Sequence, residues 1–274
     1  MNYIVVGFDF SSGSAKAVDL AIDIANRWQC NLRLVYVKER DEDEAPIRSE
    51  IERRNAGVAH LLKGIRIDYT IRSGKVSEEL TSQAEEDNAQ LVVVGTHGMS
   101  GLTNKWIGRN TYRTIAESKI PVLTLREDFN FNKDLERIIL PLDSSDDTRQ
   151  KVPMTIHFAK TFGSEVYIMG LYTSTAQDIR NVVNSYVVQT QKLLENAGIR
   201  YKTTMHEVHK NLTAETLAFA EENKADLIAI MTEQERSFSN LLLGSYANQM
   251  LEMSKIPILT VRPEQLTLSS GGHF

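Results

Sequence analysis

The sequence of 274 residues contains a single cysteine, Cys30, so no second thiol is available to pair with it. This excludes an internal disulfide and a cysteine-based metal cluster, and it suits a reducing compartment. The residue that corresponds to Cys30 in the internal repeat described below is Ser164. We therefore interpret Cys30 as structural rather than redox-active.

An excess of positive charge is also absent, because 31 Lys and Arg stand against 36 Asp and Glu, with a formal net charge of −5. This balance argues against nucleic acid or an anionic membrane as a partner, so any phosphate contact must come from a local site. No apolar run approaches a membrane span, and residues 1–9 reach an acidic residue too early for a signal peptide. We expect a cytoplasmic protein.

The chain contains an internal repeat. Residues 118–126 recur as residues 254–262, identical at seven of nine positions and offset by 136, and the same offset relates Gly108 to Gly244. Short β-rich apolar runs alternate with amphipathic stretches in both copies, which is typical of a parallel sheet with helical crossovers. The pattern predicts an α/β fold of two tandem, doubly wound, five-stranded parallel-sheet domains.

The predicted strands cover 3–8, 31–37, 66–72, 90–95 and 121–125, then 137–142, 165–171, 199–207, 226–231 and 258–262. Helices fill the gaps, and Ser11 and its neighbours form a cap for the first of them. We interpret the charged run 38–44 as a solvated loop. The predicted units are domain 1 with an intact glycine loop (1–126), a linker (127–136), domain 2 with a degenerate loop (137–263) and a flexible tail (264–274).

A glycine-rich loop follows the predicted strand 90–95. Gly95, Gly98 and Gly108 have the spacing Gly-x2-Gly-x9-Gly, and a helix begins directly after Gly108. Glycines let backbone N–H groups approach a phosphate, and the helix dipole adds partial positive charge. The loop therefore predicts an anion cradle, and on the residues alone a ligand-free tight turn stays open as the alternative.

This spacing resembles the nucleotide-binding signature of the universal stress protein family. The resemblance extends to the strands that end at Asp9 and Val37, to residues 74–76 and to the strand after Pro121, and so covers nearly the whole chain. It implies the adenine nucleotide alpha hydrolase-like fold. It also implies that the two domains pair by pseudo-twofold symmetry through their fifth strands, which are the best-matched part of the repeat.

In ATP-binding members of that family, strand-end residues hold adenosine, and the glycine loop with the following helix holds ribose and phosphates. The resemblance assigns Asp9 and Val37 to adenosine. It assigns the remaining positions to ribose and phosphates: Gly95, Gly98, Gly108, Arg109 and Asn110. A carboxylate can accept from an amine or hydroxyl, and a strand-end backbone can contact an adenine edge. A helix-capping role for Asp9 is the alternative, and the two roles are compatible.

Arg109 departs from the family pattern, which has a small hydroxyl residue there, often followed by Val where this chain has Asn110. A guanidinium either grips the phosphates or blocks them. In the second copy the loop is degenerate, because Met231 and Gln234 replace Gly95 and Gly98. Glu233 and Glu235 add negative charge, whereas Asp143, Gly244 and Ser245 are kept. We predict weak or absent ATP binding in this copy.

The expected function is that of a cytoplasmic universal stress protein whose N-terminal domain binds ATP, with room for Mg²⁺. Nucleotide occupancy would act as a stress-response or signalling state, and the C-terminal domain would serve as a dimerisation scaffold. A slow ATPase and a nucleotide-free interaction module are the alternatives. We predict no catalytic residues and no metal ligands, His206 and His209 included. A homodimer of the tandem chain stays open.

Overall fold

The computed structural model describes residues 2–38, 42–96, 107–129, 134–232, 234–235 and 242–264. The strands of the N-terminal half are β1 (Tyr3–Gly7), β2 (Asn31–Lys38), β3 (Ile67–Ser73), β4 (Leu91–Gly95) and β5 (Val122–Leu125). Its helices are α1 (Ser12–Trp28), α2 (Glu44–Val58), α3 (Val76–Glu86) and α4 (Arg109–Glu117), with a short 3-10 turn, η1 (Ala59–Leu61), after α2.

The C-terminal half repeats this order. Its main strands are β6 (Arg137–Leu142), β7 (Glu165–Tyr172), β8 (Tyr201–Glu207), β9 (Leu227–Met231) and β12 (Ile258–Val261). Its helices are α5 (Val152–Phe162), α6 (Gln177–Asn196), α7 (Leu212–Glu222) and α8 (Ser245–Met253). A hairpin of β10 (Gln234–Glu235) and β11 (Leu242–Leu243) precedes α8 and was not predicted.

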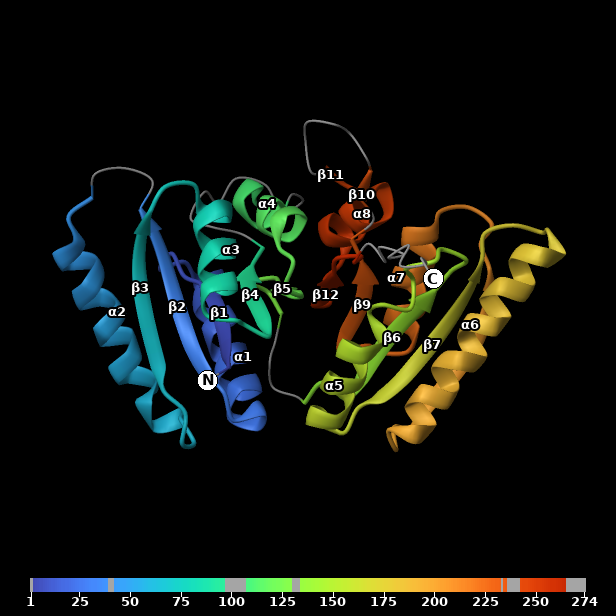
Figure 1. Ribbon diagram of the computed structural model, residues 1–274, viewed down its shortest axis with the longest axis horizontal. Helices are drawn as coiled ribbons and strands as arrows, with labels where there is room; N and C mark the ends of the chain where they lie inside the picture. The colour runs from blue at the N-terminus through green and yellow to red at the C-terminus, as the bar shows by residue number, and fades with distance from the viewer. Residues whose placement is uncertain are drawn as a thin grey trace, which may run out of the picture.

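One ten-stranded sheet crosses the whole molecule, in the order β3-β2-β1-β4-β5-β12-β9-β6-β7-β8 (Figure 1). All its pairs are parallel except the central pair of β5 and β12. Strands such as β1 and β4 are apolar and buried on both faces, as expected where helices cover both sides of a parallel sheet. The predicted fold class is confirmed.

The two halves meet through equivalent residues of their fifth strands. Leu123 of β5 pairs with Leu259 of β12, and these two residues occupy the same position of the repeat. The flanking contacts follow the same symmetry, because Thr124 Oγ1 donates to Ile258 O (3.2 Å) and Thr260 Oγ1 donates to Val122 O (3.0 Å). The expected pairing is therefore present, and each strand covers an edge that would otherwise lack a partner.

The hydrophobic core also runs across both halves, with one cluster on each face of the sheet. The first includes residues of α1, α2, α5 and α6, and the second includes residues of α3, α4, α7 and α8. On the first face Trp28 packs against His157 and Phe158 and donates from Nε1 to Thr161 Oγ1 (2.7 Å). Packing as well as strand pairing therefore joins the two halves.

The charged run 38–44 is only partly a loop. Lys38 ends β2, and Glu44 opens α2 behind Asp43, whose side chain accepts from Ala45 N. Residues 39–41 lie outside the described residues, as do residues 130–133 of the predicted linker and 265–274 of the predicted tail. Among the described helices, none has the length and apolar character needed to cross a membrane.

Candidate functional site

A cleft of about 630 Å³ opens at the carboxyl ends of β1, β2 and β4. The strand order reverses at β1, with β2 on one side and β4 on the other, which is where doubly wound sheets bind ligands. Gly98 lies outside the described residues. The other six predicted site residues all line the cleft: Asp9, Val37, Gly95, Gly108, Arg109 and Asn110.

Asp9 is exposed and lines the cleft where β1 ends. Its Oδ1 accepts from the backbone N of Ser11 (3.0 Å) and from Ser11 Oγ (2.5 Å). Ser11 is itself the N-cap of α1, because its side chain accepts from Ser14 N (3.1 Å). The capping function therefore belongs to Ser11. Asp9 positions that cap with one carboxylate oxygen while lining the cleft.

Val37 offers main-chain groups on the side of β2 that faces β1. Phe8 N donates to Val35 O (3.0 Å), and Gly7 and Val35 form the last register pair between the two strands. Successive residues of a parallel strand direct their peptide groups to alternate neighbours. The N–H and C=O of Val37 thus point to the same side as those of Val35, beyond the end of β1. They form a donor and acceptor pair at the cleft.

Gly95 is needed for packing whether or not a ligand binds. A Cβ at this position would lie 2.7 Å from the carbonyl carbon of Gly13 and 2.9 Å from its oxygen, inside the first turn of α1. The sequence argument assigned this glycine to phosphate approach, with a ligand-free tight turn as the alternative. The close approach of β4 and α1 supplies a second reason for glycine, one that does not depend on a phosphate.

The N-terminus of α4 forms the opposite wall of the cleft. Gly108 is its N-cap and donates its N–H to Thr96 O (2.8 Å), and no described side chain caps this helix end. Thr111 Oγ1 donates to Gly95 O (2.9 Å) and so fixes α4 against β4. Arg109 and Asn110 are exposed and line the cleft without closing it. A helix N-terminus of this kind favours an anion.

Tyr36 and Glu42 also line the cleft, and the sequence analysis missed both. The hydroxyl of Tyr36 donates to Glu42 Oε2 (3.1 Å). Burial raises the pKa of Tyr36, and the hydrogen bond to Glu42 and the charges of Glu42 and Asp9 add to the shift. Glu42 belongs to the charged run interpreted as solvated. Its place four residues after the end of β2, a strand that ends at the cleft, was the available signal.

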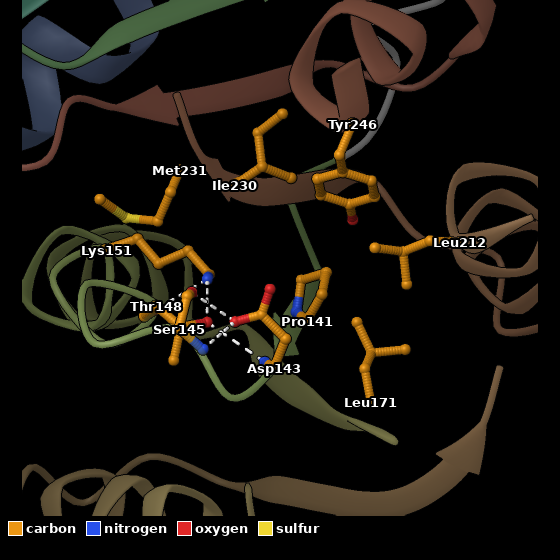
Figure 2. A pocket seen from close by; sticks show the side chains of 10 residues that line it. All are labelled: Pro141, Asp143, Ser145, Thr148, Lys151, Leu171, Leu212, Ile230, Met231 and Tyr246. Atoms are coloured by element: carbon orange, nitrogen blue, oxygen red, sulfur yellow. Dashed lines mark hydrogen bonds between the residues drawn. The ribbon is translucent and has the colours of Figure 1, made fainter. Parts of the chain in front are cut away.

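The equivalent place in the C-terminal half holds a pocket of only about 20 Å³ (Figure 2). The chain offset between the halves is 134 up to β8 and 136 from α7 onward, because two extra residues precede α7. Larger side chains replace smaller ones around the pocket: Pro141 for Gly7, Lys151 for Ala17, Leu171 for Val37, Met231 for Gly95 and Tyr246 for Asn110. These residues close the site.

Lys151 occupies the interior of this closed site. It is 3% exposed, and its Nζ donates to the carbonyl oxygen of Thr148 (2.7 Å). In Figure 2 its amino group points toward Thr148 and Asp143. Burial opposes ionisation of Asp143, but a hydrogen bond from Ser145 and the charge of Lys151 hold its pKa below the ordinary value. The carboxylate therefore has protein partners in place of a ligand.

Met231 has a consequence for the adjoining helix. The N-terminal helix α1 begins at Ser12, whereas the equivalent residues 146–151 form turns and α5 begins only at Val152. A side chain at the position of Gly95 would crowd a first helical turn packed as closely as that of α1, and Pro153 in the first turn of α5 independently favours a helix start there. Glu233 lies outside the described residues, and the side chains of Gln234 and Glu235 are likewise not described, so their predicted effect rests on sequence.

His206, His209 and Cys30 lie outside the cleft, and their contacts are with other parts of the protein. His206 Nε2 lies 2.7 Å from Glu215 Oε2, and Glu215 Oε1 accepts from the backbone N of His209 and Lys210. Across the described ranges, no three metal-ligating side chains gather into a cluster. Cys30 is buried, and burial raises the pKa of its thiol to about 11, which disfavours the reactive thiolate at neutral pH.

The comparisons with known proteins agree with this architecture. The model of the universal stress protein family matches residues 1–126 and again residues 135–262. A universal stress protein of Mycolicibacterium smegmatis is 23% identical over 95% of this chain and 97% of its own. The single-domain universal stress protein YxiE of Bacillus subtilis is 30% identical over 46% of this chain and 99% of its own. The crystal structure of a universal stress protein from Archaeoglobus fulgidus superposes with a TM-score of 0.77 at 17% identity, covering 95% of this chain and 98% of that one.

Proposed function

The chain belongs to the universal stress protein family, and from that premise we propose that its N-terminal cleft binds ATP and that occupancy serves as a stress-response signal. The observation that carries this proposal is the contrast between equivalent places in the two halves, about 630 Å³ in one and about 20 Å³ in the other. Small-molecule sites typically occupy roughly 300 to 1,000 Å³. The N-terminal site has that size, and the equivalent place in the C-terminal half does not.

The polarity of the cleft supports a nucleotide in one orientation. Asp9 and the main chain of Val37 lie at the end of β1 and β2, where they suit the hydroxyls and base edge of adenosine. The N-terminus of α4 and Arg109 lie at the other wall, where they suit the phosphates, with Mg²⁺ able to accompany them. In this arrangement Arg109 grips the phosphates, because the cleft stays open with the residue in place.

The C-terminal half acts as a scaffold in this proposal. Its β12 covers the edge of β5, and its core continues that of the N-terminal half on both faces of the sheet. Leu243 N also donates to the hydroxyl of Tyr112 on α4 (3.1 Å), so the scaffold contacts the phosphate-facing helix directly. The single buried cysteine is consistent with a cytoplasmic location.

Calorimetric titration with ATP and Mg²⁺ tests the proposal. We expect one site in the intact chain and none in Asn110→Tyr, which introduces the Tyr246 side chain of the closed site into the open one. Asn196→Tyr, the same change at an exposed position at the end of α6, should bind as the intact chain does. Absence of binding by the intact chain would contradict the proposal and favour a nucleotide-free interaction module. Sustained phosphate release that Asn110→Tyr abolishes would identify a slow ATPase instead.

A further inference from the structure

Phe10, Tyr36 and Glu42 form a group, here called the Tyr36 cluster, on one side of the N-terminal cleft. Phe10 has φ 64°, a left-handed conformation that is uncommon for a bulky residue and costs about 1 kcal/mol or more. Its ring lies 5.1 Å from that of Tyr36 and 5.1 Å from that of Phe8. The unfavourable backbone therefore places an aromatic support directly against Tyr36.

The supported Tyr36 side chain hydrogen-bonds a carboxylate at the cleft, that of the exposed Glu42. The Tyr36 hydroxyl donates to Glu42 Oε2 (3.1 Å), and both residues line the cleft together with Asp9. Asp9 already uses Oδ1 to accept from Ser11. The charge of Asp9 also contributes to the raised pKa of Tyr36, after burial and the hydrogen bond and charge of Glu42.

The closed half lacks the cluster. Ser144 and Gly170 stand where the N-terminal half has Phe10 and Tyr36, and Ser144 is not among the described residues with positive φ. Asp143 is the only carboxylate among the described residues that line the closed pocket. The C-terminal half has the same fold without the Tyr36 cluster, so the fold does not require it. The cluster occurs in the half that has the open cleft.

The hydrogen-bonding capacity of this wall selects for particular ligand groups. Carboxylates only accept, and the Tyr36 hydroxyl already donates its proton to Glu42. A ligand must therefore present hydroxyl or amino donors here, and an anionic group would be repelled. The cationic side chain of Arg109 and the N-terminus of α4 lie at the other wall. One end of the cleft therefore accepts hydrogen bonds from a ligand, and the other end favours an anion.

We infer that Glu42, held in place by Tyr36, is a specificity-determining residue that restricts the cleft to nucleotides carrying phosphate only on the 5′ chain. Nucleotides with a phosphate on the 2′ or 3′ hydroxyl then bind more weakly, because Glu42 and Asp9 repel that phosphate. This inference rests on the proposed function, because it assumes that the nucleoside end of the ligand lies beside Asp9.

The test compares ADP with adenosine 3′-phosphate 5′-diphosphate, which has the same 5′ chain and one additional phosphate. Calorimetry on the intact chain should show the second ligand binding roughly tenfold or more weakly, despite its greater negative charge. Glu42→Gln should reduce this ratio severalfold, and Tyr36→Phe should reduce it less. Glu50→Gln removes one charge from α2 at a residue paired with Arg53, outside the cleft, and should leave the ratio unchanged.

Different results would contradict nucleotide binding and the role of Glu42. If ADP binds and the 3′-phosphorylated ligand binds equally well or better, the inference about Glu42 is wrong while nucleotide binding stands. An unchanged ratio in Glu42→Gln has the same meaning. If neither ATP nor ADP binds the intact chain, the proposed function is wrong and the inference is overturned with it.

Discussion

The two halves of the chain share a sheet order and a helix order but differ at the carboxyl ends of their strands. In the N-terminal half glycine and small residues leave a cleft, whereas Pro141, Met231 and Tyr246 fill the same place in the C-terminal half. The strands beneath are equally apolar and buried in both. The sheet therefore does not depend on the residues that open or close the site.

The two halves also differ in the charges around the aspartate that follows their first strand. Asp9 is exposed in the open cleft, with Ala17 at the position that corresponds to Lys151. Asp143 has Lys151 and the hydrogen bonds from Ser145 beside it in the closed one. Both carboxylates accept hydrogen bonds from the serine two residues later in the chain. The closed site differs from the open one in the added charge of Lys151, since the open site has Ala17 at that position. Four sets of substitutions test this comparison.

Gly95→Met should have the largest effect. It imposes the residue of the closed half on the open one, where a Cβ would meet the Gly13 backbone at 2.7 Å. We expect a loss of about 3 kcal/mol in the free energy of unfolding, at the upper end for overpacking, together with loss of ATP binding. Urea denaturation measures the first and calorimetry the second.

Gly57→Met is the matched control, since a Cβ at Gly57 meets nothing within 4 Å. It should leave stability unchanged or raise it slightly. Equal stability of the two variants would contradict the claim that the approach of β4 to α1 requires glycine.

Lys151→Ala should destabilise the closed half by about 2 to 3 kcal/mol, because it leaves the half-buried Asp143 without its counter-charge. The pKa of Asp143 is lowered in the folded chain, so its contribution is present above the ordinary value near 3.8 and is lost as the pH falls through the folded pKa. The variant should therefore unfold at a higher pH during acid titration followed by circular dichroism. Combining it with Asp143→Asn should restore part of the stability, and no such recovery would argue against the pairing.

Thr124→Val and Thr260→Val test the symmetric junction. Each removes one of two equivalent hydrogen bonds across the β5 and β12 pair, so each should cost about 1 kcal/mol by chemical denaturation. We expect the two losses to agree within experimental error. A clear inequality would show that the halves contribute unequally to their shared interface.

His157 should produce the smallest effect. Burial against Trp28, with a contribution from Lys160, lowers the pKa of His157 below its ordinary 6.5, so protonation favours the unfolded chain. Stability should fall as the pH drops below about 6.5, and the fall should be smaller in His157→Gln. Unfolding free energies at pH 7.5 and pH 5.5 would measure the difference, and an equal fall in both proteins would exclude His157 as its source.

Much of the architecture was predictable because its signals are local. Apolar runs predicted all ten strands of the main sheet with ends within one or two residues. The resemblance to the universal stress protein family predicted the pairing of β5 with β12. The order of the strands then placed six site residues at one cleft. The hairpin of β10 and β11 escaped prediction because strands of two residues have no period.

The details of the two sites depend on contacts distant in the chain. Gly95 is constrained by Gly13, and the closed pocket brings Lys151 together with Met231 and Tyr246, which no local pattern reveals. Glu42 was hidden for a different reason. A charged run shows no periodicity that separates its members from one another. Glu42 is exposed like its neighbours, and the hydrogen bond from Tyr36 distinguishes it in the structure.

Hydrogen–deuterium exchange of the intact chain with and without MgATP tests the central claim of one site, in the N-terminal half, most directly. The account predicts slower exchange at the first turn of α4, after Gly108, and at the end of β2 near Val37. It predicts no change at the first turn of α8, after Gly244. Protection at α8, alone or together with α4, would contradict it.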